Sequence, residues 1–140
     1  MNKIIDVSFP GGKTVQAVLN GYRVMTDQPE TQGGKGSAPS PFQLFLSSIA
    51  TCAGFYALQF CEARNLSTHG LTLRMQGDYD SESKRYKRLS IALNLPEGFP
   101  DHHRDSIIRA MNACAVKKHL QNPPEFHMEV FPAGSNGQAK

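Results

Sequence analysis

Several segments of the chain alternate between apolar and polar residues, or are rich in β-branched and aromatic residues, as strands are. These segments are residues 4–9, 14–19, 22–26, 71–79, 86–95 and 125–131. Asn20-Gly21 separates the second and third segments and is a strong signal for a two-residue antiparallel turn. The pattern therefore predicts antiparallel strands at the start, in the middle and at the end of the chain.

Two other segments follow a helical period. Ser40 can cap a helix that begins at Pro41 and runs to about residue 64, and a second apolar stripe predicts a helix over residues 101–120. The order β-β-β-α-β-β-α-β predicts an α+β fold in which antiparallel strands surround two core helices. We expect residues 1–132 to form a single domain and residues 133–140 to form a disordered tail.

The first helix has no polar face. No charged residue occurs between Gly36 and Cys61, yet polar residues interrupt the run, so that 18 consecutive apolar residues never occur. A membrane span is therefore not predicted. A helix that is apolar on nearly all sides is either a central core helix or one buried in an oligomer interface, and we favour the interface.

Composition and charge narrow the class of protein. A chain of 140 residues fits one domain, and its formal net charge of +3 is too small and scattered to indicate a nucleic-acid partner. No secretory signal precedes the first strand, and three cysteines without framework spacing favour a cytoplasmic location. No Cys-x-x-Cys or His-Glu-x-x-His arrangement occurs, so neither a metal nor a cofactor is predicted.

The candidate chemistry lies in the cysteines. Cys52 and Cys114 each lie in an apolar helical stretch and could meet in the fold as a buried dithiol able to form a disulfide. Alternatively they pack as small apolar residues, as buried cysteines often do. Cys61 follows Cys52 by nine positions, about half a turn out of phase, and is interpreted as a packing residue. Lys117 and Lys118 lie three and four positions after Cys114, where they are either charge partners of the thiol or caps of the helix dipole.

The stretches SAPSPFQLFLSSIATC and CAVKKHL, the early Gly-Gly turn and the hairpin NGYRVMTDQP resemble the family of osmotically inducible protein C and the organic hydroperoxide resistance proteins (OsmC/Ohr). The resemblance covers about residues 7–131 and implies an intertwined homodimer with the long helices at its centre. It also implies thiol peroxidase chemistry on organic hydroperoxides. Cys52 would be the peroxidatic residue, Cys114 would resolve its sulfenic acid to a disulfide, and a dithiol reductant would complete the cycle.

Two positions depart from the organic hydroperoxide branch of that family. The branch uses an Arg after the Gly-Gly turn and a Glu early in the cysteine helix, where this chain has Lys13 and Phe42. Lysine keeps the charge but loses the planar fork of donors, and phenylalanine keeps nothing of the carboxylate. Arg23 is a further candidate charge partner. Any peroxidase activity is therefore expected to be weaker or differently activated.

Three functions follow from these observations. The leading hypothesis is a thiol-dependent hydroperoxide reductase that uses Cys52 and Cys114 in a two-cysteine cycle. The second is a non-catalytic dimer that binds a small apolar or thiol-bearing ligand, with the cysteines as packing or attachment points. The third is a structural dimer with inert thiols. Thiol reactivity separates the first from the others, because a catalytic cysteine must be accessible and low in pKa.

Overall fold

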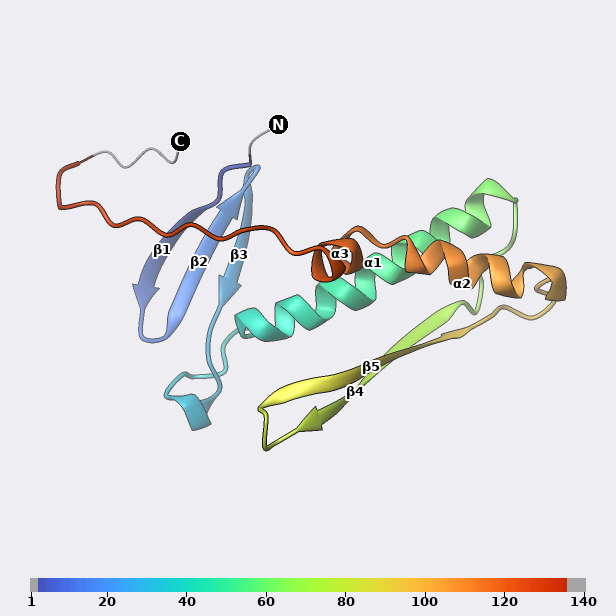
Figure 1. Ribbon diagram of the computed structural model, residues 1–140, viewed down its shortest axis with the longest axis horizontal. Helices are drawn as coiled ribbons and strands as arrows, with labels where there is room; N and C mark the ends of the chain where they lie inside the picture. The colour runs from blue at the N-terminus through green and yellow to red at the C-terminus, as the bar shows by residue number, and fades with distance from the viewer. Residues whose placement is uncertain (1–2, 136–140) are drawn as a thin grey trace.

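The protein is described by a computed structural model, which places residues 3–135 in an α+β arrangement of two antiparallel sheets and a set of helices (Figure 1). The first sheet contains β1 (Asp6–Gly11), β2 (Thr14–Leu19) and β3 (Tyr22–Thr26), in that order. Asn20 and Gly21 both have positive φ, at 50° and 81°, which is the backbone of the predicted tight turn. The hairpin is confirmed, and β1 begins two residues later than predicted.

A loop with a short 3₁₀ turn, η1 (Glu30–Gln32), leads to the long helix α1 (Pro41–Ala63). Ser40 closes a capping box at the start of α1. Its side-chain oxygen accepts a hydrogen bond from the Gln43 backbone at 3.2 Å, and the Gln43 side chain accepts one from the Ser40 backbone at 2.9 Å. Pro41 occupies the first helical position, where its missing N–H is not needed. The predicted start of this helix is confirmed.

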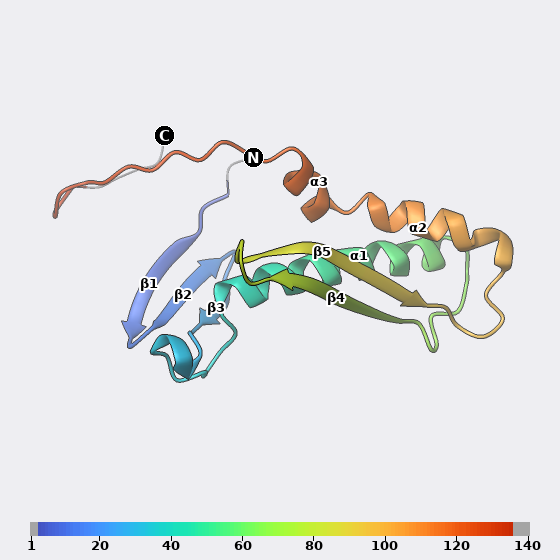
Figure 2. The ribbon, with the colours of Figure 1, turned by 60° about the horizontal axis from the view of Figure 1, so that its bottom comes forward.

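The second sheet is a hairpin of β4 (Thr72–Asp80) and β5 (Arg85–Asn94), which runs alongside α1 (Figure 2). The buried core lies between the C-terminal half of α1, the hairpin and the following helix. Its buried members are Ala57, Phe60, Cys61 and Ile107, and the residues packed around them include Leu71, Leu93, Phe99 and Met111. The first sheet lies at one end of the molecule, beyond the start of α1 (Figures 1 and 2).

The prediction of one continuous helix over residues 101–120 was wrong. The chain forms a 3₁₀ turn, η2 (Asp101–His103), then α2 (Arg104–Asn112) and α3 (Ala115–Gln121). The ladder tightens at the end of α2, where the backbone N–H of Cys114 bonds to the carbonyl of Met111 at 3.3 Å. Cys114 then turns to an extended conformation, with φ −50° and ψ 128°. The apolar period continues through this break, so periodicity alone does not show it.

The predicted last strand over residues 125–131 is also not formed in the single chain. The segment is extended but belongs to neither sheet, and its alternating Phe126, Met128 and Val130 are 81%, 92% and 96% exposed. A strand needs a neighbouring edge to pair with, and residues 3–135 place none beside the segment. Of the predicted tail, Ala133 and Gly134 form a turn, and residues 136–140 lie outside the described residues. The α+β class with antiparallel strands is confirmed.

Candidate functional site: a pair of thiols at a helix break

Cys52 lies in the middle of α1, on the side that faces the start of α3. One turn earlier, the Ser48 hydroxyl donates to the Phe45 carbonyl at 2.6 Å, so Ser48 satisfies a backbone carbonyl and is not held toward the thiol. Cys61 points the other way into the core and is fully buried. Burial raises the pKa of the Cys61 thiol, as expected of a packing residue.

The break between α2 and α3 positions Cys114. This residue occupies the N-cap of α3 and is only 2% exposed. The first backbone N–H groups of a helix have no partner within the helix and are free to donate elsewhere. Had residues 101–120 formed one helix, the N–H groups of Ala115 and Val116 would have bonded to carbonyls one turn earlier. The break therefore creates two donors next to Cys114.

These donors face Cys52. Burial raises the pKa of the Cys52 thiol, and a hydrogen bond from the Cys114 thiol lowers it. The backbone N–H groups of Val116 and Ala115 also donate to the Cys52 sulfur. Together the three donors outweigh burial, so the pKa of Cys52 lies below its ordinary value. Hydrogen bonds to the charged form favour that form, so Cys52 is the thiol of the pair that ionises more readily.

Cys114 has the opposite tendency. Burial raises the pKa of its thiol, and donation of its proton to the Cys52 sulfur raises the pKa further. Backbone N–H groups of Lys117 and Val116 oppose this shift without reversing it. The pair thus divides into Cys52, the thiol that loses its proton more readily, and Cys114, the thiol that keeps its proton more firmly.

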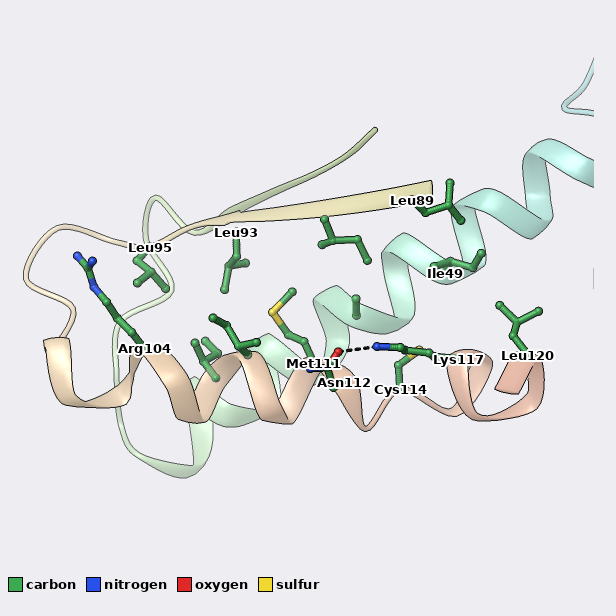
Figure 3. Close-up of a pocket in the computed structure, with 14 residues that line it drawn as sticks. Ile49, Leu89, Leu93, Leu95, Arg104, Met111, Asn112, Cys114, Lys117 and Leu120 are labelled. Atoms are coloured by element: carbon green, nitrogen blue, oxygen red, sulfur yellow. Dashed lines mark hydrogen bonds between the residues drawn. The ribbon is translucent and has the colours of Figure 1, made fainter. Parts of the chain in front are cut away.

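An apolar cavity of about 490 Å³, lined by Cys114 but not by Cys52, opens between α1, β5 and the α2–α3 segment (Figure 3). Its wall is mostly aliphatic and includes Ile49, Ala53, Leu89, Ile91, Leu93, Leu95, Ile107, Ile108, Met111 and Leu120. Its polar members are Arg104 at one end and Asn112, Cys114 and Lys117 near the thiols (Figure 3). The cavity can receive an apolar group close to Cys114.

The other predicted site residues lie elsewhere in the single chain. The Lys13 Cε lies 3.5 Å from the point where a Cβ on Gly33 would be, so this side chain packs on the loop before α1. Arg23 lies on β3, paired with Val18 of β2. Neither residue lines the cavity.

Phe42 packs against other aromatic rings, with its ring centroid 6.0 Å from that of Tyr86 and 5.5 Å from that of Phe45. Among residues 3–135, no group of three or more His, Cys, Asp or Glu side chains is placed to hold a metal ion.

Sequence reasoning missed the role of the α3 backbone and the contact between Lys117 and Asn112. The Lys117 ammonium donates to the Asn112 side-chain oxygen at 2.6 Å, across the break and within the cavity wall (Figure 3). A helix prediction without the break places Asn112 and Lys117 five residues apart, about 140° around the axis, where they would not face each other. Asn112 itself was the available signal, because asparagine is a poor residue for a helix interior.

Solved structures with the same fold come from several bacteria. One from Psychrobacter arcticus, named for osmotic stress induction and a detoxification response, has a TM-score of 0.69 at 22% identity and covers 81% of this chain and 85% of its own. An OsmC-like protein from Mycoplasma pneumoniae has a TM-score of 0.68 at 13% identity, covering 88% and 89% of the two chains. An organic hydroperoxide resistance protein OsmC from Legionella pneumophila has a TM-score of 0.59 at 16% identity, covering 86% and 90%. These likenesses establish the fold.

No curated protein matches this sequence significantly. The family model described as OsmC-like protein, however, matches residues 34–129, which is more than half of the chain and includes both helices of the thiol pair. The strands, helices and solved structures agree with this match. The chain therefore belongs to the OsmC-like protein family.

Proposed function

We propose that the protein is a thiol-dependent hydroperoxide reductase in which Cys52 is the peroxidatic residue and Cys114 the resolving one. The observation that carries this proposal is the polarised pair, in which Cys114 and two backbone N–H groups donate to Cys52. A peroxidatic cysteine must be a thiolate, and a resolving cysteine can wait as a protonated thiol. A thiol packed only as a small apolar residue has no need of three donors.

The chemistry follows from this arrangement. The Cys52 thiolate attacks the terminal oxygen of an organic hydroperoxide, an S–O bond forms, the O–O bond breaks, and the alcohol leaves after taking a proton. The Cys114 thiol then attacks the sulfur of the sulfenic acid, forming a disulfide and releasing water. A dithiol reductant reopens the disulfide. The apolar wall of the cavity supports an organic rather than a small inorganic peroxide.

We further propose that the protein acts as a homodimer. Helix α1 is long and apolar enough to cross a membrane by length and composition, and only 28% of its most apolar window is buried within the chain. Large apolar side chains remain exposed on α1 itself and on several segments of the chain outside it, among them Phe9, Val24, Phe55, Leu58, Ile91, Ile108, Leu120 and Phe126. A surface of this kind needs a cover, and a second copy with the same charge-free helix supplies one.

Light scattering after size-exclusion chromatography tests the dimer. We expect twice the chain mass of 15.4 kDa without detergent, and a monomer that stays soluble would contradict the proposal. The substitution Phe55→Glu adds a charge to the exposed side of α1 and should weaken the dimer. Glu62→Gln, also on α1 but already polar and exposed, is the matched control.

The activity is tested by consumption of cumene hydroperoxide with a dithiol reductant, comparing wild type with Cys52→Ser. Loss of turnover in the variant supports the proposal, and equal turnover by the two proteins would contradict it. Cys61→Ser is the matched control, because it removes a thiol from the same helix but from the core side. Its peroxide turnover per folded molecule should equal that of wild type.

The cavity favours a second candidate, a non-catalytic binding protein for a small apolar or thiol-bearing ligand. About 490 Å³ of mostly aliphatic space is within the range of ordinary ligand pockets. Native mass spectrometry of the freshly purified protein tests this function. A co-purifying ligand, together with no peroxide consumption by wild type, would favour binding over catalysis.

A further inference from the structure

Lys117 is a cation in an unfavourable place. It lies in the first turn of α3, where the positive end of the helix dipole repels it. No carboxylate among the described residues forms an ion pair with it, whereas Arg104 at the other end of the cavity pairs with Asp101 at 3.2 Å. A cation at the N-terminus of a helix, without a carboxylate to pair with, contributes no stability through its charge. Residues placed in this way are typical of functional sites.

The surroundings hold this charge in the cavity wall that also contains Cys114, the hydrogen-bond partner of Cys52. The Lys117 side chain is partly buried in the same cavity wall as Cys114, and its ammonium is held by the Asn112 oxygen at 2.6 Å (Figure 3). Helix α1 brings no charged group near Cys52, since none occurs between Pro41 and Cys61. The part of β5 that lines the cavity is aliphatic. On α3 itself, Lys118 and His119 are both exposed.

We propose that Lys117, positioned by Asn112, supplies the positive charge of the thiol site, a role that the resemblance to the family assigned to Lys13 or Arg23. The inference rests on the proposed function for its peroxide step. In that step the Cys52 thiolate attacks the terminal peroxide oxygen, and the O–O electron pair leaves with the alkoxide. Lys117 donates a proton to the alkoxide to release the alcohol. Its neutral amine then recovers a proton from water, while Cys52 remains as the sulfenic acid.

Asn112 acts through Lys117 and is therefore a positioning residue. Its amide oxygen accepts from the ammonium across the break, which keeps the lysine side chain over the cavity instead of extended into solvent. The hydrogen bond neutralises no charge, since the amide is neutral. Asn112 thus orients the cation without reducing its effect on an anion in the cavity.

The test measures alkylation of Cys52 by iodoacetamide across a pH range, followed by peptide mass spectrometry on the full-length protein. In Lys117→Met the pKa of Cys52 should rise, and alkylation at neutral pH should fall about three- to tenfold, as removal of a nearby opposite charge predicts. Lys117→Arg should retain the wild-type profile. Lys118→Met, the same change one residue on, is the matched control and should leave the profile unchanged.

Asn112→Ala should shift the profile in the same direction as Lys117→Met, and the double variant should show little more than Lys117→Met alone. Coincident profiles for wild type and Lys117→Met would overturn the inference. Equal shifts in Lys117→Met and Lys118→Met would overturn it too, because they would show an effect of net charge only. Circular dichroism confirms that each variant is folded.

Turnover of cumene hydroperoxide separates the effect of Lys117 on the pKa of Cys52 from its donation of a proton to the alkoxide. A loss of turnover in Lys117→Met that exceeds its loss of alkylation supports proton donation to the alkoxide, and equal losses would contradict that step. If wild type consumes no peroxide, the proposed function fails. The alkylation profiles would still decide whether Lys117 is the charge of the thiol site.

Discussion

The ring of Phe42 stacks on the ring of Tyr86, with centroids 6.0 Å apart and planes inclined by 10°. Tyr86 in turn meets Tyr79 edge to face at 5.1 Å. These contacts join the first turn of α1 to the tip of the β4–β5 hairpin. The position at which the resemblance expects an activating carboxylate is therefore used for packing. Residue 42 supplies no negative charge to the thiol site.

This relationship predicts the effect of restoring the carboxylate. Phe42→Glu should lower the free energy of unfolding by about 1–2 kcal/mol, since it removes a half-exposed aromatic contact and puts a charge beside two rings. It should not raise peroxide turnover, because Lys13, the expected partner, packs on the loop at Gly33. Urea unfolding and peroxide assays measure both effects.

Phe42→Leu is the control for this prediction, because it keeps apolar area and loses only the ring. It should destabilise less than Phe42→Glu. Faster turnover by the Glu variant would contradict the assignment of Phe42 to packing and would indicate that a cation reaches this end of α1 in the assembled protein.

Removal of the resolving thiol should stop the cycle after its first step. Cys114→Ser still permits one attack by Cys52, because the serine hydroxyl can donate to the Cys52 sulfur in place of the thiol. We expect a single turnover per chain and accumulation of sulfenic acid, detected by trapping with dimedone and mass spectrometry. Sustained turnover at the wild-type rate would show that Cys114 does not resolve Cys52.

Local sequence signals predicted correctly those strands, turns and helix ends that are determined by residues adjacent in sequence. The spans of β2 and β3, the Asn20-Gly21 turn and the start of α1 at Pro41 agree with the structure. Each rests on a local rule, namely alternation, a turn that accepts positive φ, or a capping box. The sequence also raised the juxtaposition of the two cysteines as one of two interpretations, because both lie on apolar helical stretches that could share a core.

The break before Cys114 and the unpaired last strand were not predictable in this way. The break leaves the helical period of the apolar residues intact, so the period does not indicate it. Its effect is to free backbone N–H donors for Cys52, a residue distant in sequence from the break. Residues 125–131 have the alternation of a strand, but pairing depends on an edge that the single chain does not provide. The hydrogen bond between Asn112 and Lys117 exists only because of the break.

The hairpin beneath α1 predicts a sensitive glycine. A Cβ added at Gly77 on β4 would lie 2.5 Å from the Tyr86 ring, the ring that stacks on Phe42. Gly77→Ala should therefore destabilise the protein by about 1–3 kcal/mol through overpacking. Gln76→Ala, at the neighbouring exposed position, is the control and should change stability by less than about 0.5 kcal/mol. Equal unfolding midpoints for the two variants would contradict this placement of Tyr86.

Asp27 predicts how the loop before α1 responds to acid. This buried carboxylate accepts hydrogen bonds from the Ser37 hydroxyl at 2.6 Å and the Ser37 backbone at 3.0 Å, and also from the backbone N–H groups of Gln28 and Lys35. The Ser37 hydroxyl, then the Ser37 and Gln28 backbone, lower the pKa of Asp27 from 3.8 to about 2. The carboxylate thus holds the two ends of the loop together.

Because the pKa of Asp27 is lower in the folded state, the unfolded chain binds a proton first, and stability falls as the pH drops from 3.8 toward about 2. Above pH 3.8 the full contribution of Asp27 is present. Asp27→Asn should therefore have a lower melting temperature than wild type at neutral pH, and the difference should narrow as the pH falls through this window. Asp78→Asn, which removes an exposed carboxylate, should show no such convergence. Curves for wild type and Asp27→Asn that stay parallel down to about pH 2.5 would show that the loop does not depend on this charge.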